Sequence, residues 1–280
     1  MGKEKFDLYE HVTELFIEGL KAGRIPWKKP YTGYVPTNIF SNTGYHGVNN
    51  LLLGMLPYEK PYYLTFKQCQ KLKGKVKKGS KSHIVVYWNF VKKTEHRDHG
   101  EDKEITIPFL RYYRVFNIEQ TEGIEFDIPE LQVKNNIEKI ESAEKIVQAC
   151  EPPIIYDSQL PYYSPPFDQI HLPQKEQFHS NHDYYSTVFH EIVHSTGHKS
   201  RLDRKGISEI NGRNMVQYSK EELIAEIGSS FLNHKCGFGD IEQENSQAYI
   251  NGWITRLQNN PKEIVSAAGK AQKAVDYICK

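Results

Sequence analysis

The sequence predicts an α+β protein in two parts: a small N-terminal α+β domain over residues 1–125 and a mainly helical C-terminal domain with a small sheet over residues 126–280. Strand-like and helical patterns mix in the first part, whereas apolar residues at helical spacing dominate the second. Residues 119–135 between them are acidic and turn-like, which is typical of a linker. A chain of 280 residues has room for two domains of ordinary size.

The N-terminal part opens with a helix over residues 6–21, where apolar side chains recur at helical spacing. Gly23 and Pro26 end that helix. Turns rich in Gly, Asn and Pro follow, and we expect a short helix that opens with Leu51, Leu52 and Leu53 and another that Thr65 caps. Two strands rich in β-branched and aromatic residues are then predicted, at 84–88 and 109–118.

A lysine-rich segment extends from Lys60 to Lys93, with ten lysines and no acidic residue. Such a run attracts phosphates regardless of base sequence. Within it a basic turn formed by Gly74 and Gly79 carries five lysines: Lys73, Lys75, Lys77, Lys78 and Lys81. Aromatic residues that could stack on unpaired bases accompany the run: Trp27, Tyr45, Tyr62, Tyr63, Tyr87, Trp88, Tyr112 and Tyr113. Each aromatic residue alone fits a core position better, and the lysines alone fit a solvated face, but together they favour binding of nucleic acid.

The C-terminal part begins with a predicted helix at 137–150, followed by six prolines between Pro152 and Pro173 that exclude helix there. One strand is expected in this proline-rich stretch, at 169–172. Four more helices follow, at 183–198, 219–234, 244–259 and 261–278.

The clearest chemical signal is the run His190-Glu191-Ile192-Val193-His194. On a helix, positions four apart share a face, so His190 and His194 can bind one metal ion. Glu191 lies on an adjacent flank, where it can act as general base on a water molecule. Taken alone, the motif is also compatible with two surface histidines that happen to lie four residues apart.

A catalytic zinc ion needs a third protein ligand and one open position. Glu222 and Glu226 lie four apart on an otherwise apolar helix, where an unpaired buried carboxylate would be costly, so this helix is expected to supply the ligand. Glu221 fits a solvent-facing position better. The strand at 169–172 is expected to be an exposed sheet edge beside the motif helix, to which substrate adds as a further strand. The pattern therefore predicts a zinc peptidase.

Motifs along nearly the whole chain also carry a family resemblance. In the C-terminal half they lie at 162–165, 170–173, 184–198, 200–202 and 221–226, and in the N-terminal half at 26–27, 36–38, 44–49, 63–68 and 74–79. In these segments the chain resembles the ArdC-like antirestriction proteins of mobile genetic elements. The resemblance implies an N-terminal domain that binds single-stranded DNA, a zincin-like metallopeptidase domain of gluzincin type, and protection of incoming DNA from restriction.

The resemblance to gluzincins also assigns roles to individual residues. It implies that Glu222 binds zinc and that Glu226 orients a ligand histidine. Tyr218 is a candidate for stabilising the oxyanion. The expected cofactor is Zn²⁺, and the expected partners are single-stranded DNA and a protein or peptide substrate. The alternative is a protective DNA-binding module whose zinc site is structural or idle.

The remaining features of the sequence indicate a cytoplasmic protein without a membrane anchor. The four cysteines show neither metal-ligand spacing nor a disulfide framework, as expected of reduced thiols: Cys69, Cys150, Cys236 and Cys279. The first residues lack the apolar segment of a secretory signal. No stretch approaches the roughly 20 apolar residues of a membrane span.

Overall fold

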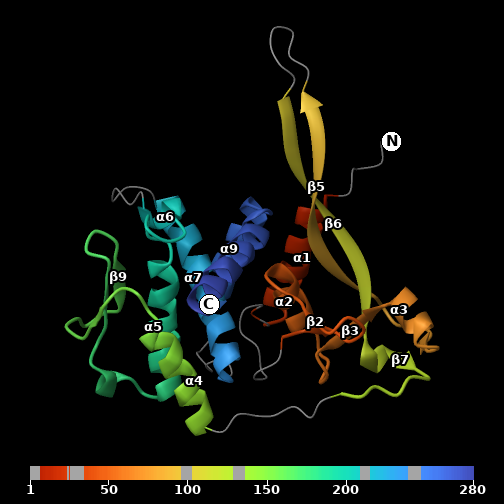
Figure 1. Ribbon diagram of the computed structural model, residues 1–280, viewed down its shortest axis with the longest axis horizontal. Coiled ribbons are helices and arrows are strands. Elements are labelled where there is room, and N and C mark those ends of the chain that lie inside the picture. The colour runs from red at the N-terminus through yellow and green to blue at the C-terminus, as the bar shows by residue number, and fades with distance from the viewer. Residues whose placement is uncertain are drawn as a thin grey trace.

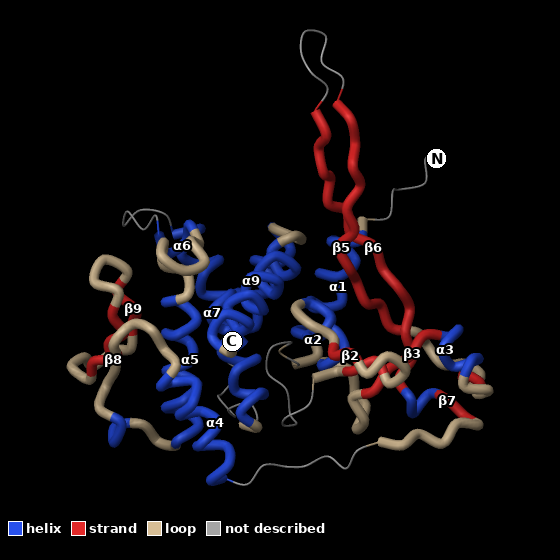
Figure 2. The backbone as a smooth tube through the Cα atoms, in the orientation of Figure 1, coloured by secondary structure: helices blue, strands red, loops and turns tan. Residues whose placement is uncertain are grey.

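The computed structural model describes residues 7–23, 25, 35–95, 103–128, 136–208, 215–238 and 247–280. Helices and strands both occur there, which confirms the predicted α+β class. Most strands lie in the N-terminal half and most helices in the C-terminal half (Figure 2). In the part of the chain so described, no helix combines the length and apolar character that a membrane-spanning helix requires.

The first helix, α1 (Leu8–Lys21), agrees with the predicted one. It begins after Asp7, whose carboxylate accepts hydrogen bonds from two backbone amides of the first turn. Its buried face packs on α8 (Gln247–Asn259) near the far end of the sequence. The Thr13 hydroxyl donates to the Pro261 carbonyl at 2.7 Å. The N-terminal helix therefore contributes to the packing of the C-terminal half.

A five-stranded sheet in the order β2-β1-β3-β6-β5 forms the centre of the N-terminal half. Its strands are β1 (Thr37–Asn38), β2 (Thr43–Gly44), β3 (Tyr62–Thr65), β5 (His83–Glu95) and β6 (Lys103–Asn117). The helices α2 (Val48–Gly54) and α3 (Phe66–Lys71) flank β3 in the sequence. Thr65 caps α3 as predicted and accepts a hydrogen bond from the Gln68 amide at 3.2 Å. A separate pair of short strands, β4 (Lys75–Val76) and β7 (Thr121–Glu122), lies beside the turn η1 (Ile118–Gln120).

The strands β5 and β6 form a long hairpin that projects from the rest of the molecule (Figure 1). Their pairing runs from His83 opposite Val115 to Glu95 opposite Lys103, so both strands are longer than predicted. The prediction missed the outer part of both strands because the residues there include charged side chains, which are typical of a hairpin tip. At the base of the hairpin, Ile84 and Val86 are buried in the main core.

The C-terminal half contains six helices within the described residues and a three-stranded sheet. The helices are α4 (Asn136–Gln148), α5 (Asn181–Ser195), α6 (Lys205–Ser208), α7 (Met215–Cys236), α8 and α9 (Glu263–Ile278). The strands are β8 (Ile154–Ile155), β9 (Tyr162–Ser164) and β10 (Gln169–His171), followed by the short turn η2 (Lys175–Gln177). The four long helices agree with the predicted ones apart from their ends.

The segment predicted as an exposed edge strand, 169–172, is the centre of its sheet instead. The strand β10 pairs with β8 on one side and with β9 on the other. The prediction was wrong because both neighbours are two or three residues long and lie in proline-rich backbone, where no alternating pattern can develop. The strand that contacts α5 from the edge of this sheet is β9.

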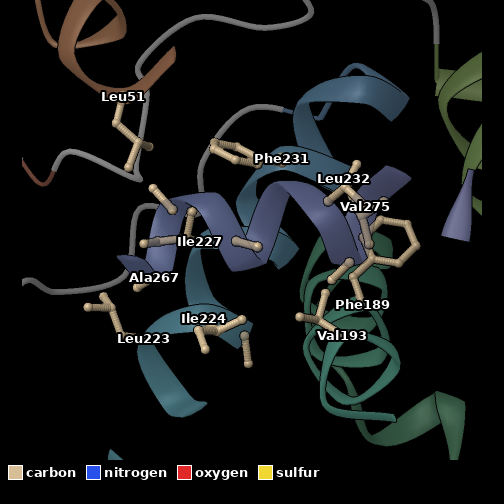
Figure 3. Close-up of a cluster of buried hydrophobic side chains, with 14 of the residues drawn as sticks. Leu51, Phe189, Val193, Leu223, Ile224, Ile227, Phe231, Leu232, Ala267 and Val275 are labelled. Atoms are coloured by element: carbon tan, nitrogen blue, oxygen red, sulfur yellow. The ribbon is translucent and has the colours of Figure 1, made fainter. Parts of the chain in front are cut away.

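One hydrophobic core joins the two halves and fixes the helices around the site (Figure 3). It contains Leu51 of α2, Phe189 of α5, and residues of α7 and α9. The helices α5 and α7 approach closely at Gly228, where an added Cβ would lie 2.8 Å from the Val193 side chain. Because no side chain separates the helices there, residues one and two turns away can meet across the interface.

Candidate metal centre

Two histidines of α5 form one side of the candidate centre. The helix begins after Ser180, whose hydroxyl accepts a hydrogen bond from the Asp183 amide, and its central part is buried. His190 and His194 lie on the same face, as the i, i+4 spacing predicts. Their Nε2 atoms are 3.0 Å apart, and the ring planes are inclined by 78°. Both rings therefore point the same nitrogen at one place.

Glu222 of α7 completes a group of three possible metal ligands. One carboxylate oxygen lies 3.4 Å from His190 Nε2, and the other lies 3.3 Å from His194 Nε2. Three atoms bound at 2.0–2.1 Å to a tetrahedral ion would be about 3.3–3.4 Å apart. Because each histidine faces a different oxygen of Glu222, the three side chains lie close enough together to share one metal ion.

The chemistry of this donor set also fits a divalent metal. Two imidazole nitrogens and one carboxylate are a common ligand set of catalytic zinc. Burial alone would raise the pKa of Glu222, but its contacts with His190 and His194 outweigh burial and hold that pKa well below the usual range. Glu222 therefore stays anionic, as a metal ligand must. The side chains of His190 and Glu222 are 24% and 30% exposed, so solvent reaches the position that a ligand would take.

Glu191 lies beside this group but is 5% exposed. Burial raises the pKa of its carboxyl, and the neighbouring histidines oppose that shift. The backbone of Tyr163 in β9 also opposes that shift. The shift that remains is upward, toward the range in which a carboxylate serves as a general base near neutral pH.

Glu221 lies on the buried side of His194, not in solvent as the sequence analysis expected. Its side chain is 2% exposed, and Oε1 is 3.6 Å from His194 Nδ1. The guanidinium of Arg204 donates to both of its carboxylate oxygens, at 3.0 and 3.1 Å from Nε. The solvated-face interpretation was wrong because it considered only pairing within the helix, whereas Arg204 comes from the segment before α6.

A second arginine attaches the hairpin of β9 and β10 to the end of α5. Arg201 donates to both oxygens of Asp168, the residue before β10, and its Nε donates to the Ser195 carbonyl at 2.8 Å. The Tyr163 hydroxyl donates to Asp168 at 2.6 Å. Burial and the Asp168 carboxylate raise the pKa of Tyr163 well above its ordinary value. These bonds hold β9 against the helix that carries Glu191.

Two other residues predicted for the peptidase site lie on α7, on either side of Glu222. Glu226 is half-buried on α7, one turn after Glu222. Tyr218 lies in the same helix one turn before Glu222, and its side chain is outside the described part of the structure. The roles assigned to both stay predictions. Sequence reasoning missed Glu221, Arg204 and the Tyr163 amide, since none of them has a spacing that relates it to the motif.

The lysines predicted to bind DNA are all exposed: Lys73, Lys75, Lys77, Lys78 and Lys81. They surround β4 and the turn at Gly79, and Lys77 Nζ also donates to the Glu119 carbonyl at 2.8 Å. Lysines at this turn are therefore accessible to a ligand.

The aromatic residues predicted to stack on bases divide into several groups. Tyr63 is 2% exposed and belongs to the core, so the prediction of a stacking role for it was wrong. Tyr45 is half-buried and packs edge-on against Tyr63. Trp27 and the side chain of Trp88 lie outside the described residues. On the hairpin, Tyr87 and Tyr113 stack with ring centroids 4.8 Å apart, and Tyr113 is 55% exposed.

Comparison with known families matches two separate segments of the chain. A family model described as the N-terminal domain of anti-restriction factor ArdC matches residues 6–116. A second, described as a zincin-like metallopeptidase, matches residues 141–270 and includes the whole candidate centre.

Three relatives and two solved structures extend the match to nearly the full chain. An uncharacterized protein of Sinorhizobium fredii, y4eC, is 30% identical over 97% of this chain and 91% of its own length. Two Escherichia coli proteins named DNA primase TraC are 34% identical, but the chain spans only 27% and 20% of their lengths. Crystal structures of the antirestriction ArdC protein from plasmid R388, metal-free and Mn(II)-bound, superpose with a TM-score of 0.76 at 36% and 35% identity. Each match covers 98% of this chain and 97% of that protein.

Proposed function

The chain belongs to the ArdC-like family of antirestriction proteins, and from this premise we propose that it is a zinc-dependent endopeptidase whose N-terminal half binds single-stranded DNA. One observation carries the peptidase proposal. His190, His194 and Glu222 converge closely enough to share one metal ion, and Glu191 is buried beside them. In this proposal the protein acts in the cytoplasm, where it protects incoming DNA of a mobile element from restriction.

A Zn²⁺ ion held by His190, His194 and Glu222 would supply a Lewis acid and lower the pKa of a water molecule. Glu191 accepts a proton from the attacking water and returns it to the leaving amine. Its raised pKa suits both steps, because a base of pKa far below the operating pH would accept the proton poorly. The Tyr163 backbone lies next to the Glu191 carboxylate and favours its charged form.

The strand β9 supports a peptide as the substrate. The amides of Ile170 and Leu172 donate toward β8, so the pair formed by Ile170 and Tyr163 exchanges no hydrogen bonds and Tyr163 directs its backbone groups outward. Two positions away on either side are Pro161 and Pro165, which have no N–H. An extended peptide can therefore donate its amides to this edge, but finds few donors there in return.

DNA binding is supported by a different part of the molecule. The exposed lysines around β4 offer charge to phosphates, and the exposed Tyr87–Tyr113 stack on the hairpin offers a flat surface to bases. The TraC relatives are named as DNA primases, which agrees with a domain that meets DNA. Since the chain spans about a quarter of their length or less, we assign no primase activity to it.

Metal content tests the peptidase proposal first. We expect one Zn²⁺ per chain in the wild-type protein and loss of that ion in His190→Ala. His179→Ala is the matched control, because His179 is exposed and lies just before the same helix. Wild-type protein that binds no zinc from a buffered solution would refute the metal site.

The alternative function, a protective DNA-binding module with an idle metal site, is separated by comparing antirestriction in cells. The peptidase proposal requires that Glu191→Gln abolish protection while metal and DNA binding persist. Full protection by Glu191→Gln would instead assign protection to the DNA-binding half.

A further inference from the structure

Behind His194, on the side away from the three ligand atoms, lies a fully buried ion pair. The side chains of Glu221 and Arg204 are 2% and 7% exposed. Removing such charges from water is costly, and a buried ion pair is often no more stabilising than apolar residues of similar size. Stability alone therefore does not account for this buried pair.

Arg204 holds the Glu221 carboxylate in a fixed orientation. Besides its bonds to both carboxylate oxygens, its two terminal nitrogens donate at 2.7 Å to Thr196 Oγ1 and to the Val193 carbonyl. Both acceptors belong to the end of the helix that carries His194. The arginine thus locks Glu221 of α7 to α5, next to the histidine.

Glu221 of this pair also contacts His194, one of the three possible metal ligands. Glu221 Oε1 lies 3.6 Å from His194 Nδ1, about half an ångström longer than an ordinary hydrogen bond. Nδ1 is buried, and no hydrogen bond of normal length reaches it within the described residues. A metal-binding imidazole must leave one nitrogen unprotonated, so the neutral ring carries its proton on the other. Here that proton belongs on Nδ1, facing Glu221.

We propose that Glu221, anchored by Arg204, is the positioning residue of His194: it accepts a hydrogen bond from Nδ1–H, so that Nε2 stays unprotonated and aimed at the metal. The inference rests on the proposed metal site. It assigns to Glu221 the orienting role that family resemblance gave to Glu226. Carboxylates that accept a hydrogen bond from a ligand histidine also make its other nitrogen a stronger metal ligand.

The test measures zinc affinity by competition with a chromogenic chelator. Removing Glu221 alone would leave the Arg204 charge buried, so both residues are replaced, as Glu221→Met with Arg204→Met. This pair of changes keeps similar volume and leaves no unpaired charge. We expect zinc affinity to fall about 10–100-fold. Glu221→Gln with Arg204→Met restores an acceptor oxygen at the same place, and affinity should recover most of that loss.

Each outcome separates the inference from simpler explanations. Equal affinity in wild type and the double Met variant would overturn the positioning role. Equal loss in both double variants would show that the pair acts only through packing. A wild-type protein without zinc affinity would refute the proposed metal site itself.

Glu221→Asp provides a second test that keeps both charges and draws the carboxylate back from Nδ1. We expect a several-fold loss of affinity, and an unchanged affinity would contradict the inference. Melting temperatures of the metal-free proteins identify any variant that fails to fold.

Discussion

The backbone of Tyr163 lies next to the carboxylate of Glu191 and acts to lower the pKa of that carboxyl. This proximity places the edge strand β9 beside the residue that we propose as the catalytic base. The same tyrosine is held through its hydroxyl by Asp168, and Asp168 is held by Arg201 at the end of α5. These contacts hold the strand edge beside the base, so displacement of β9 would change the surroundings of Glu191.

The first prediction concerns the base itself. Glu191→Gln keeps the shape of the side chain but cannot accept a proton, so peptide hydrolysis should fall by about 10²–10⁴-fold. Zinc stoichiometry should stay at the wild-type value, because Glu191 is not among the three ligands. Hydrolysis of a fluorogenic peptide library and metal analysis measure the two effects. Glu176→Gln, at an exposed position of the same domain, is the control. Hydrolysis that survives at the wild-type rate would remove Glu191 from the mechanism.

The second prediction concerns the attachment of β9. Asp168→Asn removes the nearer carboxylate from the Arg201 guanidinium, whose side chain is 3% exposed, and leaves it only the exposed Glu151 carboxylate at 3.6 Å. We expect the free energy of unfolding to fall by about 1.5–3 kcal/mol, the range for hydrogen bonds to charged groups. Asp157→Asn offers a matched control, because Asp157 is 53% exposed and pairs with His171 at the surface. Its cost should stay below about 1 kcal/mol. Urea unfolding with equal costs for the two variants would contradict this assignment.

The third prediction concerns the pH dependence of that same contact. Burial alone would raise the pKa of Asp168, but hydrogen bonds from Arg201 and Tyr163 outweigh it and lower the pKa below 3.8. A lowered pKa stabilises the fold fully above the unfolded-state value and progressively less as the pH falls through the folded-state value. The stability difference between wild type and Asp168→Asn should therefore be constant near neutral pH and shrink below about pH 4. A difference that instead widened on acidification would have the wrong sign for a carboxylate with a lowered pKa.

The fourth prediction concerns the metal. A related protein has been crystallised with Mn(II), yet two imidazoles and one carboxylate should bind Zn²⁺ more tightly, as the general order of divalent metals requires. We expect Zn²⁺ to displace Mn²⁺ when both are present at equal free concentration. Competition monitored by the electron paramagnetic resonance signal of released Mn²⁺ measures this. Retention of Mn²⁺ under those conditions would show that geometry or further ligands override the donor set.

The sequence could predict those parts of the structure that depend on residues close together in the chain. The i, i+4 spacing of His190 and His194 and the capping of α3 by Thr65 depend only on near neighbours. The long helices α1, α7 and α9 follow from apolar periodicity in the same way. Glu222 was identified from its helix and from resemblance, and the structure places it against both histidines.

The parts that could not be predicted depend on contacts between distant segments. Glu221 and Glu222 are neighbours of identical chemistry, and only the arrival of Arg204 decides which one is buried behind His194. The prediction of β10 as an edge strand failed for a similar reason. Its neighbours β8 and β9 are too short to show a sequence pattern, and they become strands only by pairing with β10. Exposure of Tyr113 and burial of Tyr63 likewise depend on where the hairpin leaves the core.

The fifth prediction concerns DNA and distinguishes charge from stacking. Lys77→Gln with Lys78→Gln should weaken single-strand binding across all sequences. It should also make the dependence of log affinity on log salt shallower by about 1.4, if each lysine makes one phosphate contact. Tyr113→Ala should instead cost about 1–3 kcal/mol of binding free energy with little change in that slope, because a stacked ring carries no charge. Fluorescence anisotropy at several salt concentrations gives both quantities.

Two controls make this prediction specific to the N-terminal half. Lys270→Gln with Lys273→Gln removes the same charge from exposed positions of α9, and it should leave affinity and slope close to wild type. Tyr113→Phe keeps the ring that stacks on Tyr87 but loses the hydroxyl contact, so it should bind almost as well as wild type. If replacing the α9 lysines weakens DNA binding as much as replacing Lys77 and Lys78 does, the affinity depends on net charge alone. If Tyr113→Ala also binds normally, the exposed face of the hairpin is not where bases stack, and the DNA-binding surface must lie elsewhere.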